Sequence, residues 1–198
     1  VGGLLSLALD MLRRAHAAFR VLAEAEARVH RTSVEEVHFH EVGAVDAIVD
    51  IVGTCAAIDH LGARLSCSPL PMGRGTVKAA HGPLPVPAPA VLEIVAKAGI
   101  PIRGDDAAAE LVTPTGAALV ATQCERFGEI PSMRPSRIGY GAGTRDLDDR
   151  PNLLRLLLGT AGATATEHVV VEANIDDMTP EVAAWVVETL LAAGALDA

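Results

Sequence analysis

The sequence predicts a mixed α/β (α+β) fold, and three observations support this prediction. Half of the 198 residues are apolar, which is enough for a sizeable core. Several segments repeat apolar residues at the spacing of an amphipathic helix. Between them lie short apolar segments punctuated by glycine and proline, as is typical of strands and turns. We expect a main α/β domain over residues 1–158, a linker over 159–167, and the first strand and helix of a smaller ferredoxin-like α+β domain over 168–198.

The N-terminal segment predicts a long amphipathic helix from Leu4 to about His30, with charged residues between its apolar ones. Glu26 and His30 are four residues apart on this helix, so we expect a local surface pair. A second, short helix is expected to begin at Thr32 or Ser33, with two glutamates near its positive end.

The next segments predict an alternation of helices and strands. A buried helix over residues 46–60 is expected to end at Gly62. ARLSCSPLPMGRGTVKAAHG is typical of strand, turn and strand, and the proline-rich PLPVPAPA leads into a helix over 91–98. ELVTPTGAALVATQCERFG predicts another helix, with Thr113 as its cap and Pro114 in its first turn.

The C-terminal part predicts a glycine-rich loop followed by a strand over residues 153–158. HVVVEANIDD predicts a further strand, and Pro180 follows at the start of a helix. The chain begins with valine and stops after AAGALDA, where a new strand is expected, so we interpret it as a piece of a longer protein.

Composition narrows the class of function. The formal net charge of -9 argues against nucleic acid as a partner. The three cysteines are widely spaced and include no CxxC pair, which favours reduced thiols in a cytoplasmic protein. No apolar run is long enough for a membrane span, so no membrane partner is expected. The sequence also has no GxSxG or HExxH motif, which argues against the common hydrolases.

The stretch VHFHEVGAVDAIVDIVG places titratable side chains in a segment that resembles protein core. Strand alternation puts His38 and His40 on one face, and Glu41 follows them directly. Asp46 and Asp50 are four apart on the next helix and therefore share a face. If that helix is buried, both carboxylates can ionise only beside a cation. Histidine and carboxylates are ligands for nickel, zinc, manganese or magnesium, so this stretch predicts a divalent metal site.

A structural alternative stays open for the same stretch. The two aspartates could form a polar stripe on a wet subunit interface, and a strand histidine could bind only backbone. His81, which precedes glycine and proline at the end of a strand, is by itself most simply a solvated loop histidine.

The segment GYGAGTR predicts an anion-binding loop. Gly139, Gly141 and Gly143 would let backbone amides approach a phosphate, and Arg145 could grip it with two hydrogen bonds. A strand rather than a helix follows the glycines, so this is not a dinucleotide-binding fingerprint. The alternative is an ordinary glycine-rich hairpin.

Two further pairs are candidates. Thr113 and Thr115 at a helix start could form a second phosphate site. Asp176 and Asp177 could cap the helix that follows them, or could hold a divalent ion for a nucleotide.

Several segments resemble one known family. LAEAEARVH, VHFHEVGAVDAIVDIVG, HGPLPVPAPA, ELVTPTGAAL, IGYGAGTRD and PNLLRLLLG occur in the order and spacing of LarC-type nickel insertion proteins. EANIDDMTPE resembles the start of that family's C-terminal domain. The resemblance covers nearly the whole chain, which is identified on these motifs as a member of the family.

The resemblance implies a CTP-dependent nickel chelatase, or cyclometallase, of the lyase class. Such proteins insert Ni(II) into pyridinium-3,5-bisthiocarboxylic acid mononucleotide, and the product serves lactate racemase and related enzymes. Magnesium or manganese accompanies CTP, and the proteins form homo-oligomers. The family's N-terminal strand region and most of its C-terminal domain are not matched here, so activity is expected of the intact protein.

The chemistry of the resemblance agrees with the residues. Imidazole and carboxylate release nickel more readily than thiolate does, which suits the ligand set between residues 38 and 50. The substrate's phosphate needs an anion site, for which the loop with Arg145 is the candidate, and His81 or Glu41 is the candidate base for the ring proton. Two other functions stay open: a nickel metallochaperone without chemistry, and a metal-dependent phosphohydrolase.

Overall fold

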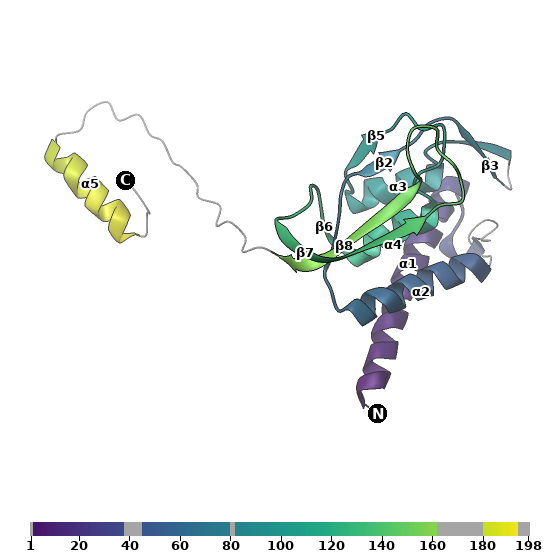
Figure 1. The fold of residues 1–198 in the computed structure, drawn as a ribbon, viewed down its shortest axis with the longest axis horizontal. Coiled ribbons are helices and arrows are strands. Elements are labelled where there is room, and N and C mark those ends of the chain that lie inside the picture. Colours follow the sequence, from purple (N-terminus) through teal and green to yellow (C-terminus); the bar gives the residue numbers. More distant parts are fainter. Residues whose placement is uncertain (1, 38–44, 80–81, 162–179, 194–198) are drawn as a thin grey trace. The chain divides into compact units, whose positions relative to one another are not determined.

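The computed structural model describes residues 2–37, 45–79, 82–161 and 180–193. The chain divides into two compact units, residues 1–162 and 163–198, which we treat separately. The first unit combines helices with small two-stranded sheets, both parallel and antiparallel (Figure 1). This confirms the predicted mixed α/β class.

The body of the first unit is helical. The α-helices among its described residues are α1 (Gly2–His30), α2 (Val45–Leu61), α3 (Pro89–Ala98) and α4 (Pro114–Gln123). Helix α1 packs against each of the other three (Figure 1). The largest fully buried side chains are Leu22, Ile51, Val91, Ile94 and Cys55. Buried alanines on α1 and α4 fill the remaining space, and Phe19 and Phe127 pack against this aliphatic core as partly buried residues.

Three predictions about the helices are confirmed. A short 3-10 helix, η1 (Val34–Glu36), follows α1, and its N-cap is Ser33. Glu26 and His30 form the expected ion pair, with 3.3 Å between carboxylate and imidazole. Gly62 ends α2 in the left-handed region, at φ 60°.

Each sheet has two strands, and all strands except β7 and β8 are only three or four residues long. Parallel pairs join β1 (Leu65–Cys67) to β6 (Cys124–Phe127) and β2 (Leu70–Met72) to β5 (Ile102–Gly104). Antiparallel pairs join β3 (Thr76–Ala79) to β4 (Gly82–Pro85) and β7 (Met133–Ala142) to β8 (Leu153–Ala161).

Two boundaries differ from the prediction. Helix α4 was expected to run on toward Gly128, but it ends at Gln123 and the next four residues form β6. The pairing of β6 with β1 competes for those backbone groups and stops the helix. The strand expected over residues 153–158 runs on to Ala161, because β7 offers pairing partners back to Met133.

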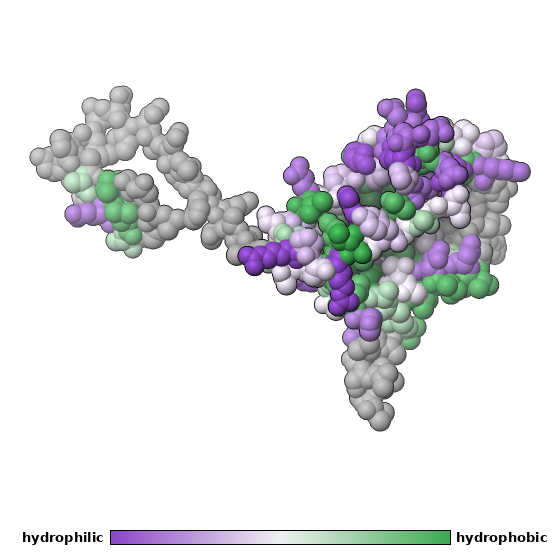
Figure 2. Space-filling model, in the orientation of Figure 1, coloured by the Kyte–Doolittle hydropathy of each residue, from purple (hydrophilic) through white to green (hydrophobic). Residues whose placement is uncertain are grey.

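The β7–β8 hairpin is largely exposed. Its apolar side chains are open to solvent on both faces, with Leu154 78% exposed and Tyr140 62% exposed. Figure 2 shows apolar surface interspersed with polar surface on this side of the first unit.

The second unit contributes one described helix, α5 (Pro180–Ala192). Its start at Pro180 agrees with the prediction, and Trp185 on it is 64% exposed. Among the described residues, no helix is long and apolar enough to cross a membrane.

Candidate functional site

The predicted metal site is only partly described. His38, His40 and Glu41 lie outside the described residues, while Asp46 and Asp50 lie in the first two turns of α2. Both aspartates are exposed, and within the described part of the chain neither forms an ion pair. Asp46 accepts a hydrogen bond from the Ala47 amide at 2.8 Å.

The expectation that α2 buries these carboxylates is wrong. The buried residues of α2 are Ala47, Ile51, Cys55 and Ile58, which follow one another at helical spacing and face the other helices. The apolar residues between them face outward, and Val49 is 61% exposed. The start of α2 therefore presents two solvated acids beside an exposed apolar surface, directly after residues 38–44.

A complete metal site does not follow from the described residues alone. Among residues 2–37, 45–79, 82–161 and 180–193, no three His, Cys, Asp or Glu side chains gather closely enough to hold an ion. Asp46 and Asp50 can supply at most part of a ligand set, so the assignment depends on residues 38–41.

The predicted glycine loop is largely a strand. Gly139 and Gly141 lie within β7, opposite Leu156 and Leu154, so the hairpin alternative describes their structure. The glycines are part of a strand here because β8 supplies hydrogen-bonding partners for the backbone of β7. Gly143 follows the strand, and its amide donates to the Asn152 carbonyl at 2.9 Å.

The part of this segment that can face an anion is therefore the loop between β7 and β8. Arg145 lies in this loop with an exposed side chain, and its backbone carbonyl accepts a hydrogen bond from the Asn152 amide group at 3.1 Å. Within the described residues its guanidinium forms no ion pair, which leaves it accessible to a phosphate.

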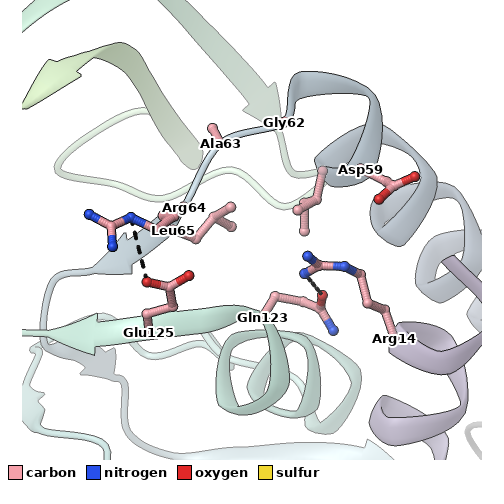
Figure 3. Close-up of a pocket in the computed structure, with 9 residues that line it drawn as sticks. Arg14, Asp59, Gly62, Ala63, Arg64, Leu65, Gln123 and Glu125 are labelled. Carbon is pink, nitrogen blue, oxygen red and sulfur yellow. Dashed lines mark hydrogen bonds and ion pairs between the residues drawn. The ribbon is translucent and has the colours of Figure 1, made fainter. Parts of the chain in front are cut away.

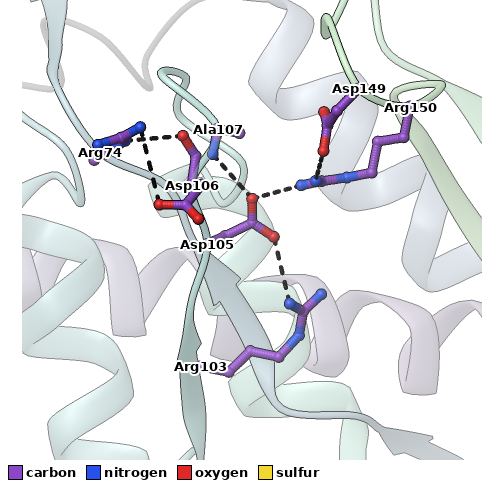
Figure 4. Close-up of polar contacts among 7 residues, drawn as sticks. All are labelled: Arg74, Arg103, Asp105, Asp106, Ala107, Asp149 and Arg150. Carbon is purple, nitrogen blue, oxygen red and sulfur yellow. Dashed lines mark hydrogen bonds and ion pairs between the residues drawn. The ribbon is translucent and has the colours of Figure 1, made fainter.

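An ion-pair network at the foot of this loop was missed from the sequence. The Asp105 carboxylate, only 5% exposed, accepts from Arg150 at 2.6 Å and pairs with Arg103 at 3.3 Å (Figure 4). It also accepts from the Ala107 amide at 3.1 Å. The hydrogen bond from Arg150 is the main cause that lowers the pKa of Asp105. Asp105 and Arg150 are 45 residues apart, so no local pattern could have paired them.

The network connects the hairpin loop to another part of the first unit. Arg150 belongs to the β7–β8 loop, whereas Asp105 directly follows β5. Arg74 reinforces the same corner by donating to the Asp106 backbone carbonyl at 2.9 Å (Figure 4). Arg145 therefore lies near one end of the β7–β8 loop, and the ion pair between Arg150 and Asp105 fixes the other end of this loop.

The second candidate phosphate site is a helix start. Thr113 is the N-cap of α4, as predicted, and its hydroxyl accepts from the Gly116 amide at 3.1 Å. Thr115 is half-buried in the first turn. His81, Asp176 and Asp177 lie outside the described residues.

A cavity of about 220 Å³ lies elsewhere, between α1, the end of α2, β1 and β6 (Figure 3). Arg14 reaches in from α1 and donates to the buried Gln123 amide oxygen at 3.1 Å. Arg64 and Glu125 pair across the rim at 3.7 Å. Its charges are balanced between two arginines and two acids, and none of the predicted site residues lines it.

Comparisons with known proteins point to one family. A family model described as nickel insertion protein matches residues 5–198. A curated relative from Citrifermentans bemidjiense is 55% identical over 182 residues, which is 90% of this chain and 47% of the relative. One from Geotalea uraniireducens is 54% identical over 179 residues, or 89% and 45%. One from Geobacter metallireducens is 50% identical over 196 residues, or 98% and 50%.

All three relatives carry the name "Putative nickel insertion protein". The chain spans about half the length of the curated relatives it matches. No solved structure gives a significant match.

Proposed function

The chain belongs to the nickel insertion protein family, and on that premise we propose that the intact protein inserts Ni(II) into pyridinium-3,5-bisthiocarboxylic acid mononucleotide. The observation that carries the proposal is the family match over residues 5–198, together with identities of 50–55% to nickel insertion relatives. The reaction would depend on CTP with Mg(II) or Mn(II), and its product would serve a lactate racemase-type enzyme.

Nickel enters this scheme as the substrate ion, so its site must both hold it and release it. We assign the ion to His38, His40, Glu41, Asp46 and Asp50. Imidazole and carboxylate bind Ni(II) as borderline and hard ligands, and they exchange more readily than thiolates. The exposure of Asp46 and Asp50 supports this role, because an incoming substrate can reach carboxylates at the surface.

The substrate's phosphate is assigned to the β7–β8 loop. Arg145 offers a guanidinium that can bind phosphate through two parallel hydrogen bonds. Anchoring of the same loop through Arg150 and Asp105 supports the assignment, since a fixed loop loses less conformational entropy on binding. The start of α4, with Thr113 and Thr115, is the second candidate for a phosphate, whether of the substrate or of CTP.

Forming the nickel–carbon bond also requires removal of a ring proton. We assign the base to His81 or Glu41, either of which can accept a proton near neutral pH when it lies beside the ring. We expect the intact protein to be a cytoplasmic homo-oligomer.

Nickel titration tests the metal assignment. Calorimetry should show Ni(II) binding that weakens at least tenfold in a His38→Ala/His40→Ala double variant. The matched control is His16→Ala/His60→Ala, which removes two exposed helical histidines and should leave the affinity unchanged. Equal affinities in all three proteins would reject these ligands without touching the family assignment.

A turnover assay then separates the enzyme from the two other functions. A full-length protein carrying this sequence is given substrate, Ni(II), Mg(II) and CTP. Nickel–carbon product that requires CTP supports the proposal. Transfer of nickel that ignores CTP would replace it with a metallochaperone, and phosphate release without nickel would replace it with a phosphohydrolase.

A further inference from the structure

The cavity beside β1 and β6 has a polar wall that the nickel chemistry does not use. Figure 3 shows the side chains of Arg14 and Gln123 meeting on one side of the cavity. On the other side, Arg64 pairs with Glu125 (Figure 3). Leu65 points into the space between these two pairs. The cavity therefore has two polar sides of different chemistry.

The charges around the cavity are balanced in number but not in pairing. Arg64 and Glu125 neutralise each other at the rim, where both side chains are more than half exposed. Arg14 is half-buried, and among the described residues it forms no ion pair, either with Asp59 or with any other acid. Its guanidinium donates instead to the neutral Gln123 side chain. A charge withdrawn from water is costly unless an opposite charge accompanies it, so this wall lacks a countercharge.

Gln123 fixes the geometry of this wall. It is the last residue of α4 and is only 5% exposed. Its amide nitrogen donates to the Thr122 hydroxyl at 2.9 Å, so its amide oxygen is the atom that faces Arg14. A guanidinium carries five N–H donors in a planar fork, and Gln123 occupies one of them. The remaining donors match the two oxygens of a carboxylate.

The volume and the apolar lining limit the anion to a small one with an aliphatic part. The cavity of about 220 Å³ has the volume of roughly seven water molecules, at about 30 Å³ each. Sites for drug-sized ligands usually occupy about 300 to 1,000 Å³, so a whole nucleotide does not fit. Ile58, which is 8% exposed, and Leu65 supply apolar surface for the rest of the ligand.

We propose that this cavity binds a short-chain carboxylate. A chain of about three to five carbons fits the volume. The carboxylate accepts two hydrogen bonds from Arg14 and supplies its missing countercharge. The hydrocarbon part lies against Ile58 and Leu65, where it is removed from water. The site is separate from the nickel and phosphate candidates, since none of their residues lines it.

An NMR titration of the 198-residue protein with sodium butyrate, at constant ionic strength, tests the site. Saturable shift changes are expected at the amides of residues 62–65 and at the Gln123 side chain. Acetate should bind about tenfold more weakly than butyrate, because each buried methylene contributes about fourfold to the affinity. Shifts that do not saturate, or inorganic phosphate that binds more tightly than butyrate, would overturn the proposal.

A pair of arginine variants tests the carboxylate contact. Arg14→Gln removes the guanidinium and should weaken butyrate binding at least tenfold. Arg13→Gln is the matched control, because Arg13 lies next to it on α1 and forms a surface ion pair with Asp10. This control should keep the native affinity. Equal affinities in the native protein and both variants would contradict the assignment.

Gln123→Glu provides a second test that keeps the volume of the cavity. The new carboxylate takes the place of the amide oxygen that accepts from Arg14, so the countercharge then comes from the protein itself. Butyrate affinity should fall at least tenfold, while circular dichroism and the thermal midpoint verify that the variant is folded. A folded variant that keeps the native affinity would mean that the carboxylate binds elsewhere.

Discussion

The helical body and the β7–β8 hairpin contain similar apolar residues, but the body buries them and the hairpin leaves them exposed. In the body, Leu22, Ile51 and Val91 are fully buried between helices. In the hairpin, Leu154 is 78% exposed and Ile138 is 58% exposed. The register puts Ile138 opposite Leu157 on one face and Leu154 opposite Gly141 on the other, so apolar side chains leave both faces. Apolar content therefore identifies the core only where the periodicity gathers it on one side.

The two regions are also held by different interactions. Area removed from water stabilises the body, at about 1.5–3 kcal/mol for each large aliphatic side chain. The hairpin depends on its backbone ladder and on the ion pair between Arg150 and Asp105 at its loop. An isolated two-stranded hairpin is marginal in water, so its order is more easily changed than that of the body.

The largest effect is expected from a matched pair of truncations. Ile51→Ala leaves a cavity at a fully buried position and should lower the free energy of unfolding by about 2–5 kcal/mol. Leu154→Ala removes a similar volume at an exposed position and should change it by less than about 0.5 kcal/mol. Urea unfolding followed by circular dichroism compares the two. Equal losses would mean that Leu154 packs against some part of the protein outside the described residues.

A smaller effect is expected within the hairpin ladder, where two glycines differ in their surroundings. A Cβ on Gly159 would overlap the backbone carbonyl of Arg134 across the strand pair, whereas a Cβ on Gly141 would meet nothing within 4 Å. Gly159→Ala should therefore push the strands apart, at about 1–3 kcal/mol. Hydrogen exchange at the β7 and β8 amides should accelerate in this variant while α3 stays protected. Gly141→Ala is the control and should leave both unchanged.

Local patterns predicted the helices well and the strands less well. The N-cap at Thr113, the stop at Gly62 and the period of α1 are set by neighbouring residues, and each is confirmed. The end of α4 was wrong because β1, far away in sequence, pairs with the residues that follow Gln123. Glycines in β7 suggested a loop because glycine has weak strand propensity, which tertiary pairing overrides.

In the candidate site, too, local placement was predicted from the sequence, whereas features that depend on tertiary packing were not. The spacing of Asp46 and Asp50 correctly placed them on one helix, but their burial was wrong, since helix α2 buries the stripe through Ala47 and Ile51 instead. The ion pair between Asp105 and Arg150 joins two segments that are far apart in sequence, so no periodic pattern could predict it. The metal site itself stays a prediction, because residues 38–41 lie outside the described part.

The smallest effect is expected from loss of the ion pair between Asp105 and Arg150, which holds the hairpin loop. Lowering the pH should reveal this effect. The Arg150 guanidinium keeps the pKa of Asp105 below its usual value of about 3.9, so the folded state binds this proton less readily than the unfolded state. The stabilisation is therefore complete above about pH 4 and is lost as the pH falls through the lowered pKa. NMR relaxation of residues 144–151 should show the loop loosening in that acid range before α3 changes. In Asp105→Asn the loop should already be loose at pH 7, with no further change on acidification. A loop that stays ordered in that variant would mean that the hairpin is held by its ladder alone.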